Sequence, residues 1–395
     1  MQSVLKFGGA ALADGATLRR SLRHVQGQLD SASHQAPIVV VSALAGVTDD
    51  LYLSAKEAAM GQAAHPLERA ASRLRIRHHS VLSQLGLSSE LLGRHLRDLS
   101  VLLAGIAQQG RLEAANLDLV LSFGERMSAR IFAAALEQSG VEATPVDAWD
   151  VGLLSDSNHG QAQPVDGIQP LIRKALRATP GVPVVTGFLA QNQSGQLTTL
   201  GRNGSDLTAA LLAEAVGASE LVFYKDVAGI HSADPKRIAA AFPLDLASYA
   251  EAAELAFHGS AVLHPAAVAP AIRAQVPVRI LPIDPKGAQA GTLLVPRIQR
   301  EGPTALACRN SSSQDLGAVA TPAWATIALV GHDLTNCPTL PGRAQSILEG
   351  EGIAVHAGLF PGRPHSFAFG VCDADLNQAC QLLHQEILVP SLMAV

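Results

Sequence analysis

The sequence is poor in aromatic residues and in cysteine, and each shortage excludes a class of protein. Aromatic residues make up 4% of the chain and hydrophobic residues 48%, so a packed interior must be built from Ala, Leu, Val and Ile. Such a core favours alternating strands and helices over an aromatic-rich β-sandwich. No two of the four cysteines form a CxxC pair. This argues against a disulfide scaffold or a structural zinc site, and it fits a reducing compartment.

Long apolar runs and an excess of positive charge are also missing. No run reaches the roughly 18 apolar residues that a membrane-spanning helix needs. Residues 1–14 carry no charged-then-apolar targeting pattern. The formal net charge is -5, with no basic stripe or tail, so nucleic acid is not an expected partner. We therefore expect a cytoplasmic protein that binds neither a membrane nor nucleic acid.

A chain of 395 residues is too long for one ordinary core, and its pattern changes after Pro296. Residues 1–298 alternate short apolar runs with helical periodicity, which predicts an α/β domain whose mostly parallel sheet is covered by helices on both faces. Residues 299–323 have little periodicity and predict a linker. Residues 324–395 predict the βαββαβ order of a small ferredoxin-like domain.

The predicted strands follow from short apolar runs, and the helices from spacings of three and four. One long helical region is expected from about Asp49 to Gln109, and shorter helices at 18–29, 127–139, 206–216 and 376–385. The predicted strands are residues 3–6, 37–42, 117–122, 182–187, 221–225 and 278–281 in the first domain, and 324–330, 353–359, 367–371 and 387–395 in the second.

Four polar segments are expected at strand ends or at the starts of the helices that follow. They are KFGG at 6–9, SFGER at 122–126, GRNGSD at 201–206 and KDVAGIHSADPK at 225–236. Open α/β sheets bind ligands at this edge, and glycine lets backbone N–H groups approach phosphate oxygens. Each segment alone is equally compatible with a turn, a helix cap or a solvated loop. Neither GxxxxGK[ST] nor GxGxxG occurs, so the P-loop and dinucleotide fingerprints do not apply.

Taken in this order, the four segments resemble the landmarks of the amino-acid kinase superfamily, and specifically its aspartate kinase branch. VSALAGVTD at 41–49, TGF at 186–188 and GSAVLHPAAV at 259–268 add to the resemblance, which covers nearly the whole chain. Residues 324–395 resemble an ACT domain. The resemblance implies phosphorylation of the side-chain carboxylate of L-aspartate to 4-phospho-L-aspartate, with ATP and Mg²⁺. A kinase for another small amino acid and a non-catalytic regulatory subunit are the alternatives.

The resemblance also implies roles for individual residues. Lys6 and Asp206 would be catalytic, Glu125 would pair with the α-ammonium group and Arg202 with the α-carboxylate. The other residues implied for substrate binding are Ser42, Thr48, Phe188 and Ser205. Those implied for the nucleotide and its phosphates are Lys6, Gly8, Gly9, Lys225, Asp226, His231 and Lys236.

The sequence departs from the family pattern at several positions. Ala261 stands where most aspartate kinases carry a lysine that contacts phosphates, and Lys225 replaces a usual Thr; we hypothesise that Lys225 supplies the lost charge. Asn203 replaces a usual Gly. The C-terminal part has room for about one ACT module instead of two, so we expect a homodimer joined at least partly through residues 324–395. An amino-acid effector is a candidate ligand there.

Overall fold

The computed structural model describes residues 2–30, 35–61, 64–260, 262–284, 291–300, 302–310, 324–357 and 363–390. The chain divides into two compact units, of which the first holds residues 1–226 and 266–284 and the second residues 227–265 and 285–395. Residues 227–265 therefore group with the C-terminal part, although the sequence placed them with the N-terminal domain. Among the described residues, no helix is both long and apolar enough to cross a membrane.

The first unit is built on a parallel sheet. Its strand order is β3-β5-β2-β1-β8-β10, and every pairing among these strands is parallel. All residues of β1, β2 and β5 are buried, as expected for strands covered on both faces. The strands are β1 (Val4–Phe7), β2 (Ile38–Val41), β3 (Ala143–Val146), β5 (Val182–Thr186), β8 (Leu221–Lys225) and β10 (Val278–Pro282).

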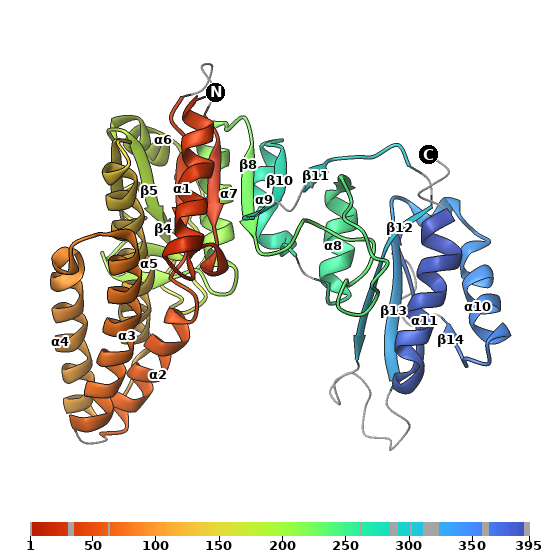
Figure 1. The fold of residues 1–395 in the computed structure, drawn as a ribbon, viewed down its shortest axis with the longest axis horizontal. Coiled ribbons are helices and arrows are strands. Elements are labelled where there is room, and N and C mark those ends of the chain that lie inside the picture. Colours follow the sequence, from red (N-terminus) through yellow and green to blue (C-terminus); the bar gives the residue numbers. More distant parts are fainter. Residues whose placement is uncertain are drawn as a thin grey trace. The chain divides into compact units, whose positions relative to one another are not determined.

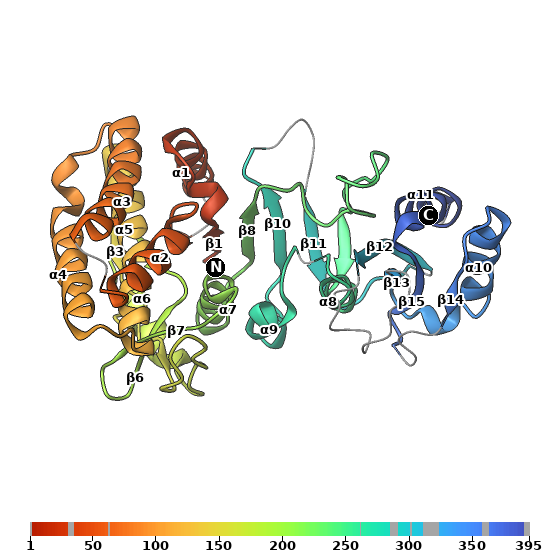
Figure 2. The same ribbon diagram turned by 90° about the horizontal axis from the view of Figure 1, so that it is seen from below.

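Helices cover both faces of this sheet (Figures 1 and 2). Helix α5 packs on β3 and β5, whereas α7 packs on β1, β2 and β8, and Figure 2 shows α1 and α7 on opposite sides of β1. The helices are α1 (Gly15–Asp30), α2 (Val47–Ala59), α3 (Ala64–Leu85), α4 (Gly93–Gln109), α5 (Ala114–Gln138), α6 (Gln169–Ala178), α7 (Gly204–Val216) and α9 (Pro265–Arg273), with short 3-10 turns η1 (Gly9–Leu12) and η2 (Ser89–Leu92). A small sheet joins β4 (Leu154–Ser155), β6 (Leu189–Asn192) and β7 (Leu197–Thr199).

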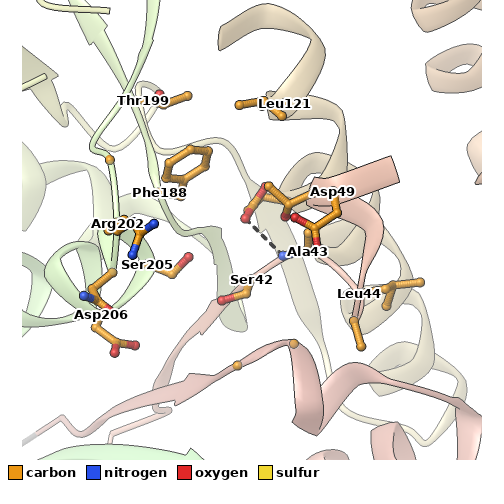
Figure 3. A pocket seen from close by; sticks show the side chains of 18 of the residues that line it. Ser42, Ala43, Leu44, Asp49, Leu121, Phe188, Thr199, Arg202, Ser205 and Asp206 are labelled. Carbon is orange, nitrogen blue, oxygen red and sulfur yellow. Dashed lines mark hydrogen bonds between the residues drawn. The ribbon is translucent and has the colours of Figure 1, made fainter. Parts of the chain in front are cut away.

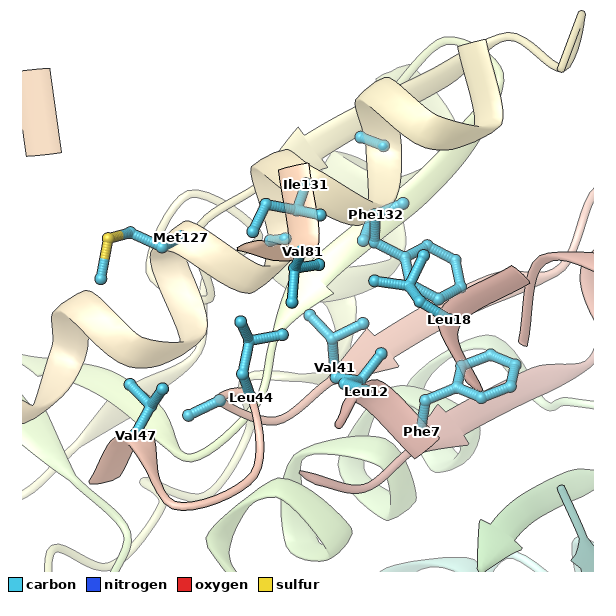
Figure 4. Close-up of a cluster of buried hydrophobic side chains, with 14 of the residues drawn as sticks. Phe7, Leu12, Leu18, Val41, Leu44, Val47, Val81, Met127, Ile131 and Phe132 are labelled. Atoms are coloured by element: carbon cyan, nitrogen blue, oxygen red, sulfur yellow. The ribbon is translucent and has the colours of Figure 1, made fainter. Parts of the chain in front are cut away.

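Alternation along β1 separates the core from the site. Leu5 and Phe7 belong to a large apolar cluster with residues of α1 to α5 (Figure 4), and the Phe7 ring lies 5.3 Å from that of Phe132 and 4.8 Å from that of Tyr224. Fully burying such a side chain contributes about 1.5–3 kcal/mol. Because successive strand residues point to opposite faces, Lys6 points to the other face, where α7 begins.

The second unit holds an antiparallel sheet with strand order β12-β13-β15-β14. Its core also includes Ala233 and Ile238 from the segment 227–265. The elements are β9 (Leu246–Ser248), α8 (Tyr249–Phe257), β11 (Thr292–Val295), β12 (Pro303–Asn310), β13 (Trp324–Gly331), η3 (Leu334–Asn336), α10 (Leu340–Gly350), β14 (His356–Ala357), β15 (Ser366–Cys372), η4 (Asp373–Asp375), α11 (Leu376–Leu383) and the π-helical turn η5 (His384–Leu388).

The fourth strand of this sheet comes from an unexpected place. Residues 303–310, predicted as part of a linker, form β12 and pair with β13. The predicted last strand at 387–395 is wrong over its described residues, because 384–390 continue the helical C-terminus; residues 391–395 lie outside the described residues. Within residues 324–390 the described order is βαββα, which matches the first five elements of the expected βαββαβ order. The final strand is not formed over its described residues, and β12 adds a strand from before the predicted domain.

One strand of the first unit was also predicted wrongly. Residues 117–122 lie inside α5, which runs without a break through 122–126 to Gln138. The short apolar run suggested a strand, and periodicity cannot separate a strand from a buried helix over so few residues. The long helical region from Asp49 to Gln109 is confirmed as α2, α3 and α4.

Candidate active site

A cavity of about 810 Å³ opens in the first unit at the carboxyl ends of β1 and β2 and the start of α7 (Figure 3). All the residues predicted for catalysis and substrate binding line it, as do Gly8, Gly9 and Lys225. Asp226 follows Lys225 in the chain but does not line the cavity. His231 and Lys236 belong to the second unit, and Ala261 lies outside the described residues.

A buried carboxylate holds two ammonium groups at one end of the cavity. Lys6 Nζ lies 2.6 Å from Oδ1 of Asp206, and Lys225 Nζ donates to Oδ2 of the same residue at 3.0 Å. Burial lowers the pKa of Lys6 below its ordinary value, and the attraction of Asp206 opposes this shift only in part. Burial would raise the pKa of Asp206, but the two lysines outweigh it and hold that pKa below its usual value. The arrangement offers positive charge to an anionic ligand.

Two glycines follow Lys6 at the turn after β1. A Cβ on Gly8 would lie 3.3 Å from Lys6 Nζ, and one on Gly9 would lie 3.4 Å from the carbonyl oxygen of Ala43. A side chain at Gly8 would fill space next to the ammonium group, and one at Gly9 would face the loop that follows β2. The turn after β1 thus leaves backbone accessible beside a cation, which suits a phosphate group.

The first turn of α7 packs against the end of β5 with almost no clearance. A Cβ on Gly187 would lie 2.5 Å from that of Ser205, and one on Gly204 would lie 2.8 Å from Cδ2 of Phe188. Phe188 itself has φ 68, and its N–H donates to Oγ1 of Thr208 at 3.1 Å. Left-handed backbone is costly for a bulky residue, so these contacts hold Phe188 at the cavity wall.

Asn203 also has left-handed backbone, with φ 59, directly before α7. This conformation favours glycine, and asparagine is the side chain that tolerates it best. The structure therefore gives a physical reason for the sequence departure at Asn203: the position requires a left-handed residue, and both Gly and Asn supply one.

Glu125 is a second buried acid of the cavity besides Asp206, with 3% of its surface exposed. Its Oε1 accepts the N–H of Ala43 at 3.1 Å (Figure 3), and no hydrogen-bond partner exists for Oε2 among the described residues. Burial raises the pKa of Glu125 to about 8. A buried carboxylate with one free oxygen is suited to receive a cation from a ligand.

The neighbours of Glu125 in SFGER have structural tasks. A Cβ on Gly124 would lie 2.7 Å from the Cβ of Ala43, so this glycine allows α5 to approach the loop that follows β2. Arg126 stacks over Phe123, with its guanidinium carbon 4.8 Å from the ring centre, and lies 3.9 Å from Asp147. Glu125 is therefore placed from the middle of a helix, not from a strand end as the sequence suggested.

Asp118 is a cavity residue that the sequence analysis missed. It is 1% exposed, and its carboxylate accepts hydrogen bonds from the 159–160 turn and from Thr199. On α5 it precedes Glu125 by seven residues, which is two helical turns. The spacing was visible in the sequence, but it carries meaning only on a helix, and this segment was predicted as a strand.

Arg202 is the exposed cation of the cavity. It lies beside Phe188 and Ser205 (Figure 3) and is separated from α7 by Asn203. A guanidinium group can bind a carboxylate through two parallel hydrogen bonds. The cavity therefore combines a lysine pair, an acid with a free oxygen and an arginine, which together can bind a zwitterion next to a polyanion.

Comparison with known proteins agrees with this geometry. Residues 1–282 match the model of the Amino acid kinase family. Aspartokinase 1, chloroplastic, of Arabidopsis thaliana is 34% identical over 283 residues, which cover 70% of this chain and 49% of that protein. The chain spans about half the length of the curated relatives it matches first. The chain belongs to the amino acid kinase family.

Two crystal structures extend the similarity over the whole chain. E. coli aspartokinase III in complex with aspartate and ADP, in its R-state, aligns with a TM-score of 0.79. The same enzyme with lysine and aspartate, in its T-state, aligns with a TM-score of 0.80. In both, the identity is 27%, and the alignment covers 98% of this chain and 99% of the other.

Proposed function

We propose that this chain transfers the γ-phosphoryl group of ATP to the side-chain carboxylate of L-aspartate, giving 4-phospho-L-aspartate. The observation that carries the proposal is the free Oε2 of the buried Glu125, in the same cavity as Lys6, Lys225 and Arg202. The ammonium group of an amino acid would donate a hydrogen bond to Oε2 of Glu125, whereas an N-acylated acid would leave this carboxylate without a cation. The aspartate bound by the similar E. coli enzyme supports this acceptor.

In this proposal the substrate backbone is bound by opposite charges. Glu125 accepts from the α-ammonium group, and Arg202 binds the α-carboxylate through its planar fork. Ser42, Thr48 and Ser205 offer hydroxyl groups along the cavity, and Phe188 forms an apolar wall. Together these contacts leave the side-chain carboxylate as the only free nucleophile.

The lysine pair addresses the main difficulty of the reaction. A carboxylate is already ionised at pH 7, so no general base is needed, but it must approach a polyanionic triphosphate. Lys6 and Lys225 offset that repulsion and stabilise the negative charge of the phosphoryl group during transfer. Asp206 holds both ammonium groups in place. The backbone at Gly8 and Gly9 would face a phosphate group of ATP, which would bring Mg²⁺ held mainly by phosphate oxygens and water.

The remaining nucleotide contacts are proposed from the sequence. Asp226, His231 and Lys236 lie within the segment 225–236, which resembles the nucleotide-binding loop of the family. His231 Nδ1 lies 3.1 Å from the carbonyl oxygen of Gly229. The N–H of Lys236 donates to Oδ1 of Asp234 at 2.9 Å. Both residues are thus ordered by bonds within their own loop.

The test is an ADP-release assay with Mg-ATP that offers L-aspartate, L-glutamate and N-acetyl-L-glutamate in parallel, with hydroxylamine to trap an acyl phosphate. We expect ADP release with aspartate alone and a hydroxamate product. Release with another acid would redefine the acceptor. Binding of ATP without release for any acid would favour a non-catalytic regulatory subunit.

Lys225 gives the proposal a second test. The side chain shares Asp206 with Lys6, so Lys225→Ala removes one of two cations from the phosphate end of the cavity. We expect a higher KM for ATP and a turnover at least tenfold lower. An unchanged KM and turnover would rule out a role in compensating for Ala261.

We further propose that residues 324–395 form an ACT-like regulatory domain that binds an amino-acid effector and joins two chains in a homodimer. The sheet β12-β13-β15-β14 provides strands for such an association, and the similar E. coli enzyme was crystallised with lysine. Light scattering at micromolar concentration should give the mass of a dimer. A monomer alone would contradict the proposal.

A further inference from the structure

Asp118 makes an unusually complete set of hydrogen bonds for an acid that touches no lysine or arginine among its described contacts. Oδ1 accepts the hydroxyl of Thr199 at 2.6 Å. Oδ2 accepts from His159 Nδ1 at 2.7 Å, from the N–H of Gly160 at 3.2 Å and from the N–H of Thr199 at 3.3 Å. The carboxylate therefore ties α5 to both β7 and the 159–160 turn.

At one end, this connection is rigidly coupled to Glu125. Seven residues separate Asp118 from Glu125 in an unbroken helix, so the two side chains lie on nearly the same face, about 10 Å apart along the axis. Both line the cavity. Because the helix between them is unbroken, the hydrogen bonds that fix Asp118 also fix the position of Glu125.

At the other end, the connection leads to Arg202. Thr199 is followed by Leu200, whose N–H donates to the carbonyl oxygen of Phe188 at 2.9 Å. Gly201 has φ 72, and a Cβ there would lie 3.2 Å from the carbonyl oxygen of Gly160. The 159–160 turn and strand β7, both bound by Asp118, thus lie on either side of Gly201, the residue directly before Arg202.

We propose that Asp118 is a positioning residue that fixes the distance between Glu125 and Arg202, and so matches the cavity to the ammonium and carboxylate groups of one α-amino acid. The proposal rests on the proposed function, because it assigns both partners to the same substrate. Both oxygens of Asp118 are engaged by Thr199, His159 and Gly160, so the proposal gives it no contact with the reacting carboxylate or the phosphoryl group. Its effect therefore falls on amino-acid binding and not on ATP.

The experiment measures both Michaelis constants for Asp118→Asn. The amide keeps the size of the side chain, but its NH₂ group faces donors that need an acceptor. We expect the KM for L-aspartate to rise at least tenfold while the KM for ATP stays within twofold. Equal changes in the two constants, or no change, would overturn the proposal.

A matched control lies in the same turn region. Asp156 is exposed, and its Oδ1 accepts the N–H groups of Asn158 and Gln163 at 3.1 and 3.0 Å, but it does not line the cavity. Asp156→Asn makes the same charge change and should leave both constants within twofold. If Asp118→Asn fails to fold, Thr199→Val keeps the shape and removes only the hydroxyl, and it should raise the KM for aspartate about threefold to fivefold without affecting ATP.

The outcomes separate this proposal from the proposed function. A wild-type protein that does not phosphorylate aspartate overturns both. A wild-type protein that is active, with an Asp118→Asn variant whose aspartate and ATP constants move together, overturns the positioning role alone.

Discussion

Glu125 links the chemistry of the cavity to pH. Its pKa of about 8 in the free protein means that this carboxyl group is mostly protonated at pH 7. An ammonium group placed against Oε2 favours the ionised form and lowers the pKa. Binding of an amino acid should therefore release a proton from Glu125, about nine-tenths of one per molecule bound at pH 7.

Calorimetry in buffers of different ionisation enthalpy measures this release. The apparent affinity for aspartate should rise about tenfold per pH unit below pH 8 and level off above it, because only ionised Glu125 accepts the ammonium group. Glu125→Gln should bind more weakly, with no proton release and no such slope. A flat affinity between pH 6 and pH 8 in the wild-type protein would contradict this assignment.

The same residue affects stability with a definite sign. The folded-state pKa of Glu125 lies above its ordinary value of 4.5, so ionisation of this group opposes folding. Its contribution to the free energy of unfolding is therefore lost progressively as the pH rises from about 4.5 to about 8. A buried acid of this kind, kept at a cost in stability, is typical of functional sites.

Several residues of the site could be predicted because their chemistry is local. Gly8, Gly9 and the Gly-Ser-Asp start of α7 stand out in the sequence as glycine-containing turns expected near a ligand, and all of them line the cavity. Asp118 could not be found in this way, because its role depends on bonds to Thr199 and His159, which lie far away in the chain. The bridge from Asp206 to both Lys6 and Lys225 is likewise a product of tertiary structure.

At the scale of elements, helix α5 has the largest part in building the cavity, because it carries Asp118, Gly124 and Glu125 on one unbroken helix. Its close approach to the loop after β2 depends on Gly124, where a Cβ would lie 2.7 Å from that of Ala43. Gly124→Ala should force the helix outward and cost about 1–3 kcal/mol in the free energy of unfolding. It should also raise the KM for aspartate, because Glu125 and the N–H of Ala43 move apart.

Gly105→Ala is the matched control for this substitution. Gly105 lies within α4, and a Cβ there would meet no atom within 4 Å. Alanine in an open helical position should stabilise the fold by about 0.5–1 kcal/mol. Chemical unfolding of both variants provides the measurement, and a stabilising Gly124→Ala would contradict the role given to this contact.

The elements themselves were predictable to different degrees. Strands β1, β2 and β5 show as mainly apolar runs because both of their faces are buried. Strand β3 was not predicted, and it is only partly buried. Strand β12 was missed because Pro303 and polar residues interrupt its pattern, and its place depends on pairing with β13. Tertiary pairing decided this strand, whereas residues 117–122 were misassigned because a short apolar run fits a strand and a buried helix equally well.

At the scale of the whole molecule, the segment 227–265, which begins with residues proposed to bind the nucleotide, packs with the C-terminal sheet in one unit. Oγ of the fully buried Ser232 lies 2.9 Å from Nε2 of His384, and the N–H of Leu306 donates to the carbonyl oxygen of Ser232 at 2.8 Å. Burial lowers the pKa of His384. This favours a neutral ring, whose Nε2 can accept a hydrogen bond from the Ser232 hydroxyl. Ser232 directly follows His231, a proposed nucleotide contact.

Ser232→Ala tests whether this connection reaches the nucleotide. The variant leaves a buried ring nitrogen without its partner, which should lower the free energy of unfolding by about 1–3 kcal/mol, and it should raise the KM for ATP. Ser100→Ala, which removes an exposed hydroxyl on α4, should change neither by a measurable amount. Thermal unfolding and the KM for ATP are measured for both variants. A lower stability of Ser232→Ala with an unchanged KM for ATP would show that the sheet stabilises the loop but does not affect nucleotide binding.

The grouping of residues 227–265 with the C-terminal residues determines where the protein can be truncated and which segments must be exchanged together between relatives. A protein ended at residue 298 would keep Ala233 and Ile238 but lose the apolar side chains that cover them. It would also leave the carboxylate of Glu254 without Arg363 and Ser366, which donate to it at 2.6–2.8 Å. Residues 227–265 and the C-terminal sheet thus belong to one compact unit. We expect exchange of this sheet between relatives to succeed only if residues 227–265 are exchanged with it.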